Sequence, residues 1–234
     1  MEESSGIPFE SQLEPLEWAK FIIRTRSEEN YNEAFSILST QANMGVADAE
    51  FCLGLLYARG QGIHRNFNLA RSWFERASEK GHMSATYFLG KIYNRGYGVP
   101  KDTAMAAKLY TVPAENGDAR AQYSLAQIYF DGEGVGKDYH AAAKWFELAA
   151  EGGHNEAQFV LGQLYKTGCG VEQNTEKAVN WLISAAMNRH KGAQILLGNM
   201  YESGDGVPQD HDEAVRWYDM TDKVVIPSAD YEKA

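Results

Sequence analysis

Apolar residues recur along this chain with a helical period, and the whole pattern returns every 36 residues. Each copy has an alanine, a leucine four residues later and a tyrosine eight residues later, which places the three side chains on one helical face. The copies are Ala49, Ala85, Ala121, Ala157 and Ala193, then Leu53, Leu89, Leu125, Leu161 and Leu197, then Tyr57, Tyr93, Tyr129, Tyr165 and Tyr201. Five copies in phase predict a repeat protein.

A pair of glycines follows this first helix in every copy. The pairs are Gly60/Gly62, Gly96/Gly98, Gly132/Gly134, Gly168/Gly170 and Gly204/Gly206. Because glycine adopts positive φ at no steric cost, the pair is predicted to end the helix and reverse the chain. A second helix is predicted to begin at an Asn or Asp, the preferred N-cap types: Asn66, Asp102, Asp138, Asn174 and Asp210.

Two further positions indicate close packing of these helix pairs. The second helices carry a large side chain on their apolar face, which predicts core packing for Trp73, Trp145, Trp181 and Trp217, with Leu109 in the same slot. The first helices carry a glycine that costs about 1 kcal/mol relative to alanine. Close approach of a neighbouring helix is the expected compensation at Gly54, Gly90, Gly162 and Gly198, and Ala126 keeps the slot small in the remaining unit.

Three places depart from the pattern. Extending the frame backwards gives a degenerate unit with its first helix near residues 13–24 and Trp18 in the glycine slot, as expected of a capping repeat. Pro113 lies inside a second helix and predicts that this helix kinks or ends early. Arg189 replaces the glycine that follows other second helices and predicts an altered turn. We expect one solenoid domain, with a cap at 1–48, repeats at 49–228 and a tail at 229–234.

These residues resemble the Sel1-like repeat family, a relative of the tetratricopeptide repeat, over about residues 31–223. The unit that begins at Ala157 shows the pattern well, with Leu161, Gly162, Tyr165, Gly168, Gly170, Val171, Asn174, Ala178, Trp181, Ala185 and Ala186. The resemblance implies an all-α fold, a right-handed α-α superhelix of helix-turn-helix repeats. It also implies an adaptor that presents a concave surface to a protein partner. The cysteine-rich branch of the family has a disulfide in each repeat, and this chain lacks those cysteine pairs.

Charge and cysteine usage narrow the classes of function. The net charge is −10, which argues against nucleic-acid binding. Acidic residues dominate residues 1–34 and 202–234, as expected of polar capping segments, although an acidic tail that binds a partner is the alternative. Cys52 and Cys169 lie too far apart in a linear stack for a mutual disulfide and fit a cytoplasmic compartment. The chain begins with Met and shows no signal sequence or 18-residue apolar run, so we expect a complete cytoplasmic product with no membrane contact.

Other candidate chemistry has a simpler structural explanation. His82, His154 and His190 share one repeat position with Asp118, and a metal site is the functional alternative. Stacked helices are about 8–10 Å apart, whereas zinc ligands lie about 2.0–2.3 Å from one ion, so a helix-capping or linker role is favoured. The glycine pairs follow helices rather than strands, which argues against phosphate loops. No nucleophile with a neighbouring base is evident, and we expect neither an enzyme nor a cofactor.

The predicted binding surface is the side of the first helices opposite their apolar face. The third, seventh and tenth positions from each alanine share this side. The third position is aromatic in four units and has the alternative of packing between repeats, whereas the other two vary between copies as binding positions do. Rings mixed with amides and cations are typical of interface hot spots. The predicted partner-binding residues are Tyr87, Lys91, Asn94, Tyr123, Gln127, Phe130, Phe159, Gln163, Lys166 and Asn199.

The function expected from the sequence is a monomeric, non-enzymatic adaptor, of bacterial origin, that binds another protein or peptide in its concave groove. An immunity-type or regulatory protein is a sharper version of this hypothesis. A scaffold that holds several partners at once is a further version. The alternative from another class is a hydrolase similar to that proposed for the cysteine-rich relatives.

Overall fold

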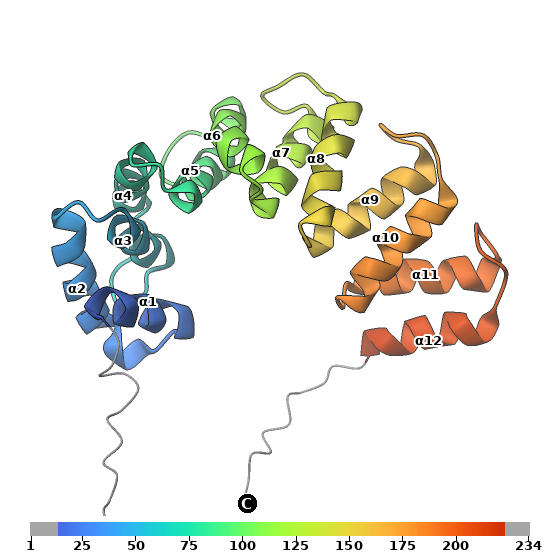
Figure 1. Ribbon diagram of the computed structural model, residues 1–234, viewed down its shortest axis with the longest axis horizontal. Coiled ribbons are helices and arrows are strands. Elements are labelled where there is room, and N and C mark those ends of the chain that lie inside the picture. Colours follow the sequence, from blue (N-terminus) through green and yellow to red (C-terminus); the bar gives the residue numbers. More distant parts are fainter. Residues whose placement is uncertain (1–13, 223–234) are drawn as a thin grey trace, which may run out of the picture. The chain divides into compact units, whose positions relative to one another are not determined.

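The computed structural model describes residues 14–222, and in that range the chain is helical throughout, with no strand (Figure 1). The helices are α1 (Pro15–Thr25), α2 (Tyr31–Asn43), α3 (Ala47–Arg59), α4 (Phe67–Glu79), α5 (Met83–Arg95), α6 (Thr103–Glu115), α7 (Ala119–Asp131), α8 (Tyr139–Glu151), α9 (Asn155–Thr167), α10 (Thr175–Met187), α11 (Lys191–Ser203) and α12 (His211–Asp222), with a 3-10 turn, η2 (Glu28–Asn30), before α2. The predicted all-helical repeat fold is confirmed. The predicted tail at 229–234 lies outside the described residues.

The chain divides into two compact units, the first ending at Pro113 and the second beginning at Ala114. In unit 1 each helix from α1 to α5 packs against the next one in the sequence, and in unit 2 the same holds from α7 to α12. Each 36-residue repeat supplies one first helix (α3, α5, α7, α9 and α11) and one second helix (α4, α6, α8, α10 and α12).

The predicted turn and cap chemistry is confirmed. The first glycine of each pair ends a first helix in the left-handed conformation, with φ of 71° at Gly60 and 72° at Gly168. At each second helix the side chain of the predicted N-cap residue accepts a backbone N–H. The bonds run to Asn66 from Leu69, to Asp102 from Met105, to Asp138 from His140 and Ala141, to Asn174 from Lys177, and to Asp210 from Glu213.

The small residue in each first helix is explained by the second helix of its own repeat. A Cβ built on Gly54 would lie 2.6 Å from the ring of Phe74, and one built on Gly162 would lie 2.7 Å from Leu182. These contacting side chains follow the tryptophan slot by one residue. They are the fully buried members of the second helices, whereas Trp73 is only partly buried against the core. The predicted close approach and the predicted core packing of the tryptophan series are both confirmed.

The second glycine of four of the five pairs, Gly62, Gly98, Gly170 and Gly206, has a packing role that the sequence did not reveal. A Cβ on Gly98 would lie 3.1 Å from Cβ of Phe67, and one on Gly170 would collide with the backbone of Tyr139. Both neighbours are the first residue of the second helix in the preceding repeat. The turn of one repeat therefore rests on the start of a helix in the repeat before it, and only glycine leaves room for this contact.

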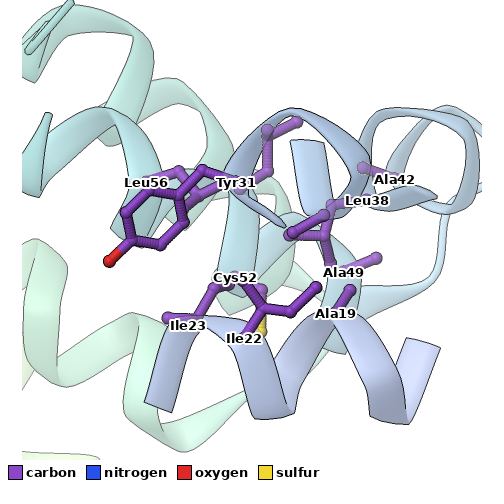
Figure 2. Close-up of a cluster of buried hydrophobic side chains, with 11 residues drawn as sticks. Ala19, Ile22, Ile23, Tyr31, Leu38, Ala42, Ala49, Cys52 and Leu56 are labelled. Atoms are coloured by element: carbon purple, nitrogen blue, oxygen red, sulfur yellow. The ribbon is translucent and has the colours of Figure 1, made fainter. Parts of the chain in front are cut away.

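The degenerate N-terminal repeat has the predicted helix pair. Helix α1 begins at Pro15, close to the predicted start, and its buried residues Ala19, Ile22 and Ile23 join those of α2 and α3 in one cluster (Figure 2). Leu38 of α2 is completely buried in the same cluster. This repeat therefore covers the apolar face of α3 in unit 1, as a capping repeat does.

At the irregular positions, the early end expected for the helix with Pro113 and the altered turn expected at Arg189 are both wrong, while a kink at Pro113 stays a prediction. Helix α6 does not end early at Pro113, because it continues to Glu115 and has the same 13-residue length as its counterparts. Proline lies close enough to the C-terminal end that only the last turn has to accommodate its missing donor. The turn after α10 is not altered either. Arg189 adopts φ of 63°, in the same left-handed region as the glycines that precede other first helices, such as Gly153 at 80°.

Candidate functional site

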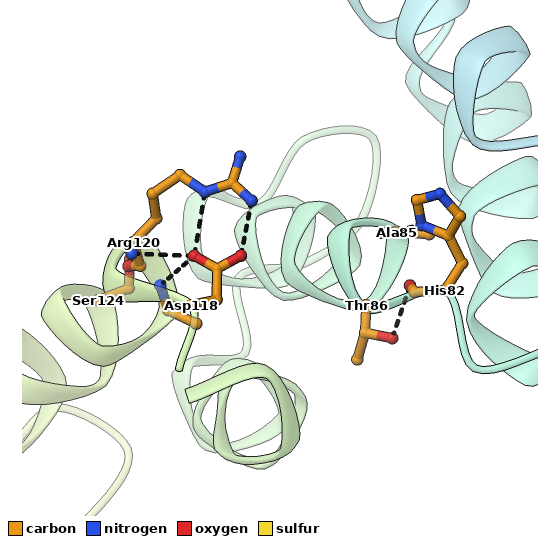
Figure 3. Close-up of polar contacts among 7 residues, drawn as sticks. His82, Ala85, Thr86, Asp118, Arg120 and Ser124 are labelled. Carbon is orange, nitrogen blue, oxygen red and sulfur yellow. Dashed lines mark hydrogen bonds and ion pairs between the residues drawn. The ribbon is translucent and has the colours of Figure 1, made fainter. Parts of the chain in front are cut away.

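The residue before four of the five first helices caps the helix with its side chain, and three of these residues, all histidines, also contact the preceding first helix. The ring Nδ1 of His82, His154 and His190 accepts the N–H of the alanine three residues later at 3.1–3.2 Å. Asp118 does the same with a carboxylate, and it also binds the Arg120 side chain (Figure 3). Because Nδ1 accepts, the proton of each imidazole resides on Nε2, which in His190 donates to Glu156 at 3.0 Å. The predicted capping role of these histidines is confirmed.

Each histidine cap stacks on the aromatic third position of the first helix before it. The ring centroids are 4.5 Å apart for Phe51 and His82, 4.4 Å for Tyr123 and His154, and 4.3 Å for Phe159 and His190. Burial lowers the pKa of His154 from its ordinary value, although Glu156 and Asp118 oppose the shift. Burial raises the pKa of Tyr123 to about 12. Two predicted partner-binding rings, Tyr123 and Phe159, are thus packed between repeats, each against the histidine cap of the next first helix.

In three of the five repeats, a buried amide at the position after the repeat alanine joins consecutive helices. In unit 2, Nε2 of Gln122, Gln158 and Gln194 donates to a backbone carbonyl eight residues earlier, at the end of the preceding second helix. In unit 1 the equivalent residues are Thr86 and Glu50, and the carboxylate of Glu50 has no donor to offer. Arg76 replaces it, because its guanidinium binds the Ala42 carbonyl and the Glu50 carboxylate together. These contacts join each of these first helices to the second helix that precedes it.

Three of the predicted partner-binding residues meet around one cavity in unit 2. The unit 2 hollow, of about 470 Å³, is lined by residues that include Gln127, Phe130, Asp131, Phe146, Gln163 and Cys169. Its floor is apolar, because the buried ring of Phe146 lies beneath it and Phe130 packs on that ring with centroids 6.3 Å apart. Gln127 and Gln163 are exposed at the rim. The unit 2 hollow therefore offers an aromatic floor with amide donors and acceptors around it.

Unit 1 contains a cavity of similar construction. The unit 1 hollow, of about 380 Å³, is lined by residues that include Arg59, Arg65, Phe67, Phe74, Lys91 and Tyr97. Its floor is the buried ring of Phe74, and its side is formed by Phe67 and Tyr97, which stack with centroids 4.7 Å apart. Lys91, from the predicted set, is exposed at the rim with Nζ 5.9 Å from the centre of the Phe88 ring. The rim is cationic rather than amide-lined.

The other four predicted residues lie outside both cavities. Tyr87 packs against the rings of Phe88 and Tyr110, and Asn94 is half-buried in the last turn of α5. Lys166 forms an ion pair with Asp205 at 2.8 Å. Asn199 accepts a hydrogen bond from the Tyr218 hydroxyl at 2.7 Å.

Several lining residues escaped the sequence reasoning. Arg59 and Asp131 occupy the eleventh position from the repeat alanine, which reads Arg59, Arg95, Asp131, Thr167 and Ser203 along the chain. This position varies as widely as the seventh and tenth, so the same criterion of variation would have found it. Tyr97 and Cys169 lie between the paired glycines and reach the cavities only because the turn folds back. No helical periodicity points to a residue in such a turn.

Neither cysteine is in a disulfide. Cys52 is buried in unit 1, and burial raises its pKa to about 11, whereas Cys169 is partly exposed in unit 2. Among residues 14–222, no group of three His, Cys, Asp or Glu side chains is placed to hold a metal ion. Over the same stretch, no helix combines the length and apolar character that crossing a bilayer requires.

Comparison with known proteins identifies the repeat. Five consecutive segments match the model of the Sel1 repeat: residues 47–82, 84–118, 119–154, 155–190 and 192–220. The first segment begins at the start of α3, so the degenerate repeat of α1 and α2 lies outside the match. No curated protein sequence matched the chain significantly.

Solved structures with the same fold include two with substantial sequence identity. A protective antigen of uropathogenic Escherichia coli with an SLR fold is 35% identical and has a TM-score of 0.78, over 80% of this chain and 40% of that one. The chain thus spans less than half the length of this relative. A Sel1 repeat protein from Oxalobacter formigenes is 32% identical with a TM-score of 0.78, over 87% of this chain and 84% of that one. An immunity protein from Pseudomonas aeruginosa is 18% identical with a TM-score of 0.55, over 90% and 84%, and shares the fold.

Proposed function

Because the chain belongs to the Sel1 repeat family, we propose that it is a non-enzymatic adaptor that binds a segment of another protein on its first helices. Sel1 repeat proteins are protein-interaction scaffolds. The unit 2 hollow carries the proposal for this chain. It combines an aromatic floor with exposed amides, a composition that favours tight contacts at the centre of protein interfaces.

The chemistry of the reactive side chains supports a non-catalytic role. The three repeated histidines use Nδ1 to cap helices, so this nitrogen is not available as a base. The Cys52 thiol is buried with a raised pKa, which makes it a poor nucleophile at neutral pH. An immunity or regulatory role is a narrower form of the adaptor proposal, and the identity of the partner decides between them.

The test of the proposal begins with cross-linked affinity capture to identify a partner, which is then purified and titrated by calorimetry. Phe130→Ala is expected to weaken binding by about thirtyfold, since truncating a hot-spot residue costs about 2 kcal/mol. Lys144→Ala is the matched control, because Lys144 is exposed on second helix α8 and lines neither hollow. If Phe130→Ala leaves the affinity unchanged while Lys144→Ala lowers it, the binding surface is on the second helices and the proposal is wrong.

A further inference from the structure

The unit 1 hollow continues into a second cavity that shares its basic residues. This neighbouring cavity, of about 750 Å³, is lined by residues that include Arg26, Tyr31 and Gln61, and it shares Ala58, Arg59 and Arg65 with the unit 1 hollow. The two cavities therefore form one surface that extends from the end of α1 to the turn after α5. We call it the basic surface and define it by Arg26, Arg59, Arg65 and Lys91.

The cations of the basic surface have no acidic partner among the residues whose side chains the structure describes. All four are exposed, and none forms an ion pair with a described residue. Four other basic residues of unit 1 are paired: Lys20 binds Asp48, Arg71 binds Glu75, and Arg76 and Lys80 both bind Glu50. Among the described residues that line the two cavities, none is acidic. Four unpaired cations thus lie together in a chain whose net charge is −10.

The same surface has an apolar floor and rings that hold two of the cations. The guanidinium of Arg65 lies 5.4 Å from the centre of the Phe67 ring, and Lys91 lies 5.9 Å from that of Phe88. Cation–π contact restrains these side chains, so less conformational entropy is lost when they bind a ligand. Tyr97, at the edge, is 39% exposed although it stacks on Phe67. The hollow between these rings is at the small end of the range for ligand pockets and fits one large side chain.

We propose that the basic surface binds an acidic segment of a partner protein, which places one aromatic or large aliphatic side chain in the unit 1 hollow. Guanidinium groups match carboxylates in geometry and charge, and an acid-free basic rim attracts a peptide of opposite charge. A peptide can also bury an apolar side chain on the floor of the hollow, whereas a free carboxylate or phosphate ion has no such group. The inference rests on the proposed function and adds the chemistry of the partner.

The equivalent hollow in unit 2 shows that the fold does not require this charge. A shift of 72 residues maps Arg59 onto Asp131 and Lys91 onto Gln163, while the floor residue Phe74 maps onto Phe146. The floor is kept and the cationic rim is not. The rim residues of unit 1 can therefore be exchanged for those of unit 2 without disturbing the packing beneath them.

The test uses fluorescence anisotropy with a labelled twelve-residue peptide in which Glu and Asp flank a central Phe. One control peptide replaces the acids by Gln and Asn, and a second replaces Phe by Ala. The acidic peptide is expected to bind saturably, and each control at least about tenfold more weakly, because each lacks contacts worth about 1.4 kcal/mol or more. Raising the salt concentration from 50 to 500 mM is expected to weaken the binding of the acidic peptide more than that of the uncharged control peptide, since exposed charges are screened.

Two double variants locate the site. The double variant Arg59→Asp with Lys91→Gln carries the residues of unit 2 at these positions. It is expected to bind the acidic peptide at least about tenfold more weakly than wild type does. Lys144→Asp with Lys191→Gln changes the net charge by the same amount at exposed positions away from both hollows, and its affinity is expected to stay within about twofold. Equal losses in both variants would mean that net charge alone attracts the peptide and would overturn the proposal. If the first variant melts lower than wild type, Ala58→Phe fills the hollow instead and should also weaken binding.

Other outcomes also overturn the inference. These are no saturable binding of the acidic peptide at millimolar concentration, tighter binding of duplex DNA, or self-association in sedimentation that Arg59→Asp with Lys91→Gln abolishes. The last result would assign the basic surface to a second copy of the chain. The adaptor proposal is judged separately, because it depends on how an authentic partner responds to Phe130→Ala. Loss of that response with intact acidic-peptide binding contradicts the adaptor surface in unit 2 but not the basic surface.

Discussion

The unit 1 and unit 2 hollows occupy the same place in the repeat, two repeats apart, and differ mainly at their rims. Both have a buried aromatic ring from a second helix as the floor, Phe74 in unit 1 and Phe146 in unit 2. In unit 1 the hollow is bordered by Ala58 and Arg59, and in unit 2 by Phe130 and Asp131. One hollow is therefore open and cationic, and the other is partly filled by its own ring and has no excess of positive charge.

This difference separates the residues that the repeat needs from those that it leaves free. A floor ring is part of the core of each repeat, so its substitution changes the stability of the fold. The rim residues contact water on one side, and changing them costs little stability. These two repeats therefore keep the same cavity floor and differ in the chemistry of the rim.

The floors are expected to be energetically equivalent. Phe74→Ala and Phe146→Ala should each destabilise the protein by about 3–5 kcal/mol, because both remove a buried ring and leave a cavity. Chemical denaturation monitored by circular dichroism measures both. A loss below about 1 kcal/mol in either variant would mean that the hollow can collapse around the missing ring, and the two floors would no longer be comparable.

The rim ring of unit 2 is expected to act on binding more than on folding. Phe130→Ala should cost about 2 kcal/mol of partner affinity if the ring is a hot spot. It should also cost about 1 kcal/mol of stability, since the half-buried ring packs on Tyr139 and Phe146. The reciprocal change Ala58→Phe puts a ring at the equivalent place in unit 1 and serves as the matched variant. A stability loss of Phe130→Ala that equals that of Phe146→Ala would place the ring in the core.

The turns before the first helices provide a reciprocal test of backbone strain. Arg189→Gly in unit 2 should stabilise the protein by about 1 kcal/mol, because a non-glycine residue in the left-handed region carries that cost. Gly81→Arg in unit 1 should destabilise it by a similar amount. Gly81 has φ of 81° and nothing within 4 Å of an added Cβ, so the change tests the backbone alone. Thermal denaturation of the pair measures both, and equal melting temperatures would contradict the assigned strain.

The smallest effect is a pH dependence at the His154 cap. The pKa of His154 is lowered in the folded protein because the ring is half-buried against Tyr123. The unfolded chain therefore takes up the proton first as pH falls below the ordinary histidine value of about 6.5. The stability contributed by the neutral cap is complete above that value and is lost as pH falls through the folded pKa. His154→Asn keeps an N-cap side chain without a titrating ring.

The measurement is the melting temperature of wild type and His154→Asn at pH 7.5 and pH 5.5. The melting temperature of the wild type should fall more between pH 7.5 and pH 5.5 than that of the variant. The exposed His211, whose pKa is raised by its hydrogen bond to Glu202, titrates in the opposite sense and is common to both proteins. Identical losses in the two proteins would show that His154 does not contribute to the acid dependence.

The repeat and its helices could be predicted because local chemistry specifies them. The paired glycines, the Asn and Asp caps and the alanine–leucine–tyrosine face each act within a few residues, so their outcomes did not depend on distant parts of the chain. The early helix end expected at Pro113 and the altered turn expected at Arg189 are wrong for a related reason. Rules for single residues overestimate these effects, since α6 keeps the length of its counterparts and Arg189 adopts the left-handed conformation of the equivalent glycines.

The candidate site was only partly accessible to such reasoning. Helical periodicity correctly grouped Gln127, Phe130 and Gln163 on one side, and the structure brings them to one cavity. It also grouped Tyr123 and Phe159 with them, although these rings are covered by the histidine caps of the following repeats. Which member of a helical face remains open is decided by the neighbouring repeat, and a single helix does not contain that information.

The sequence by itself therefore determined the period, the two helices of each repeat, their caps and turns, and the family, because these follow from interactions over a few residues. Only the tertiary structure decided that Arg26, Arg59, Arg65 and Lys91 lie together without acidic partners, and that Tyr97 and Cys169 reach the hollows. These residues belong to different helices and turns. Their proximity arises when the turn of one repeat rests on the preceding repeat through a glycine, a contact for which periodicity has no signal.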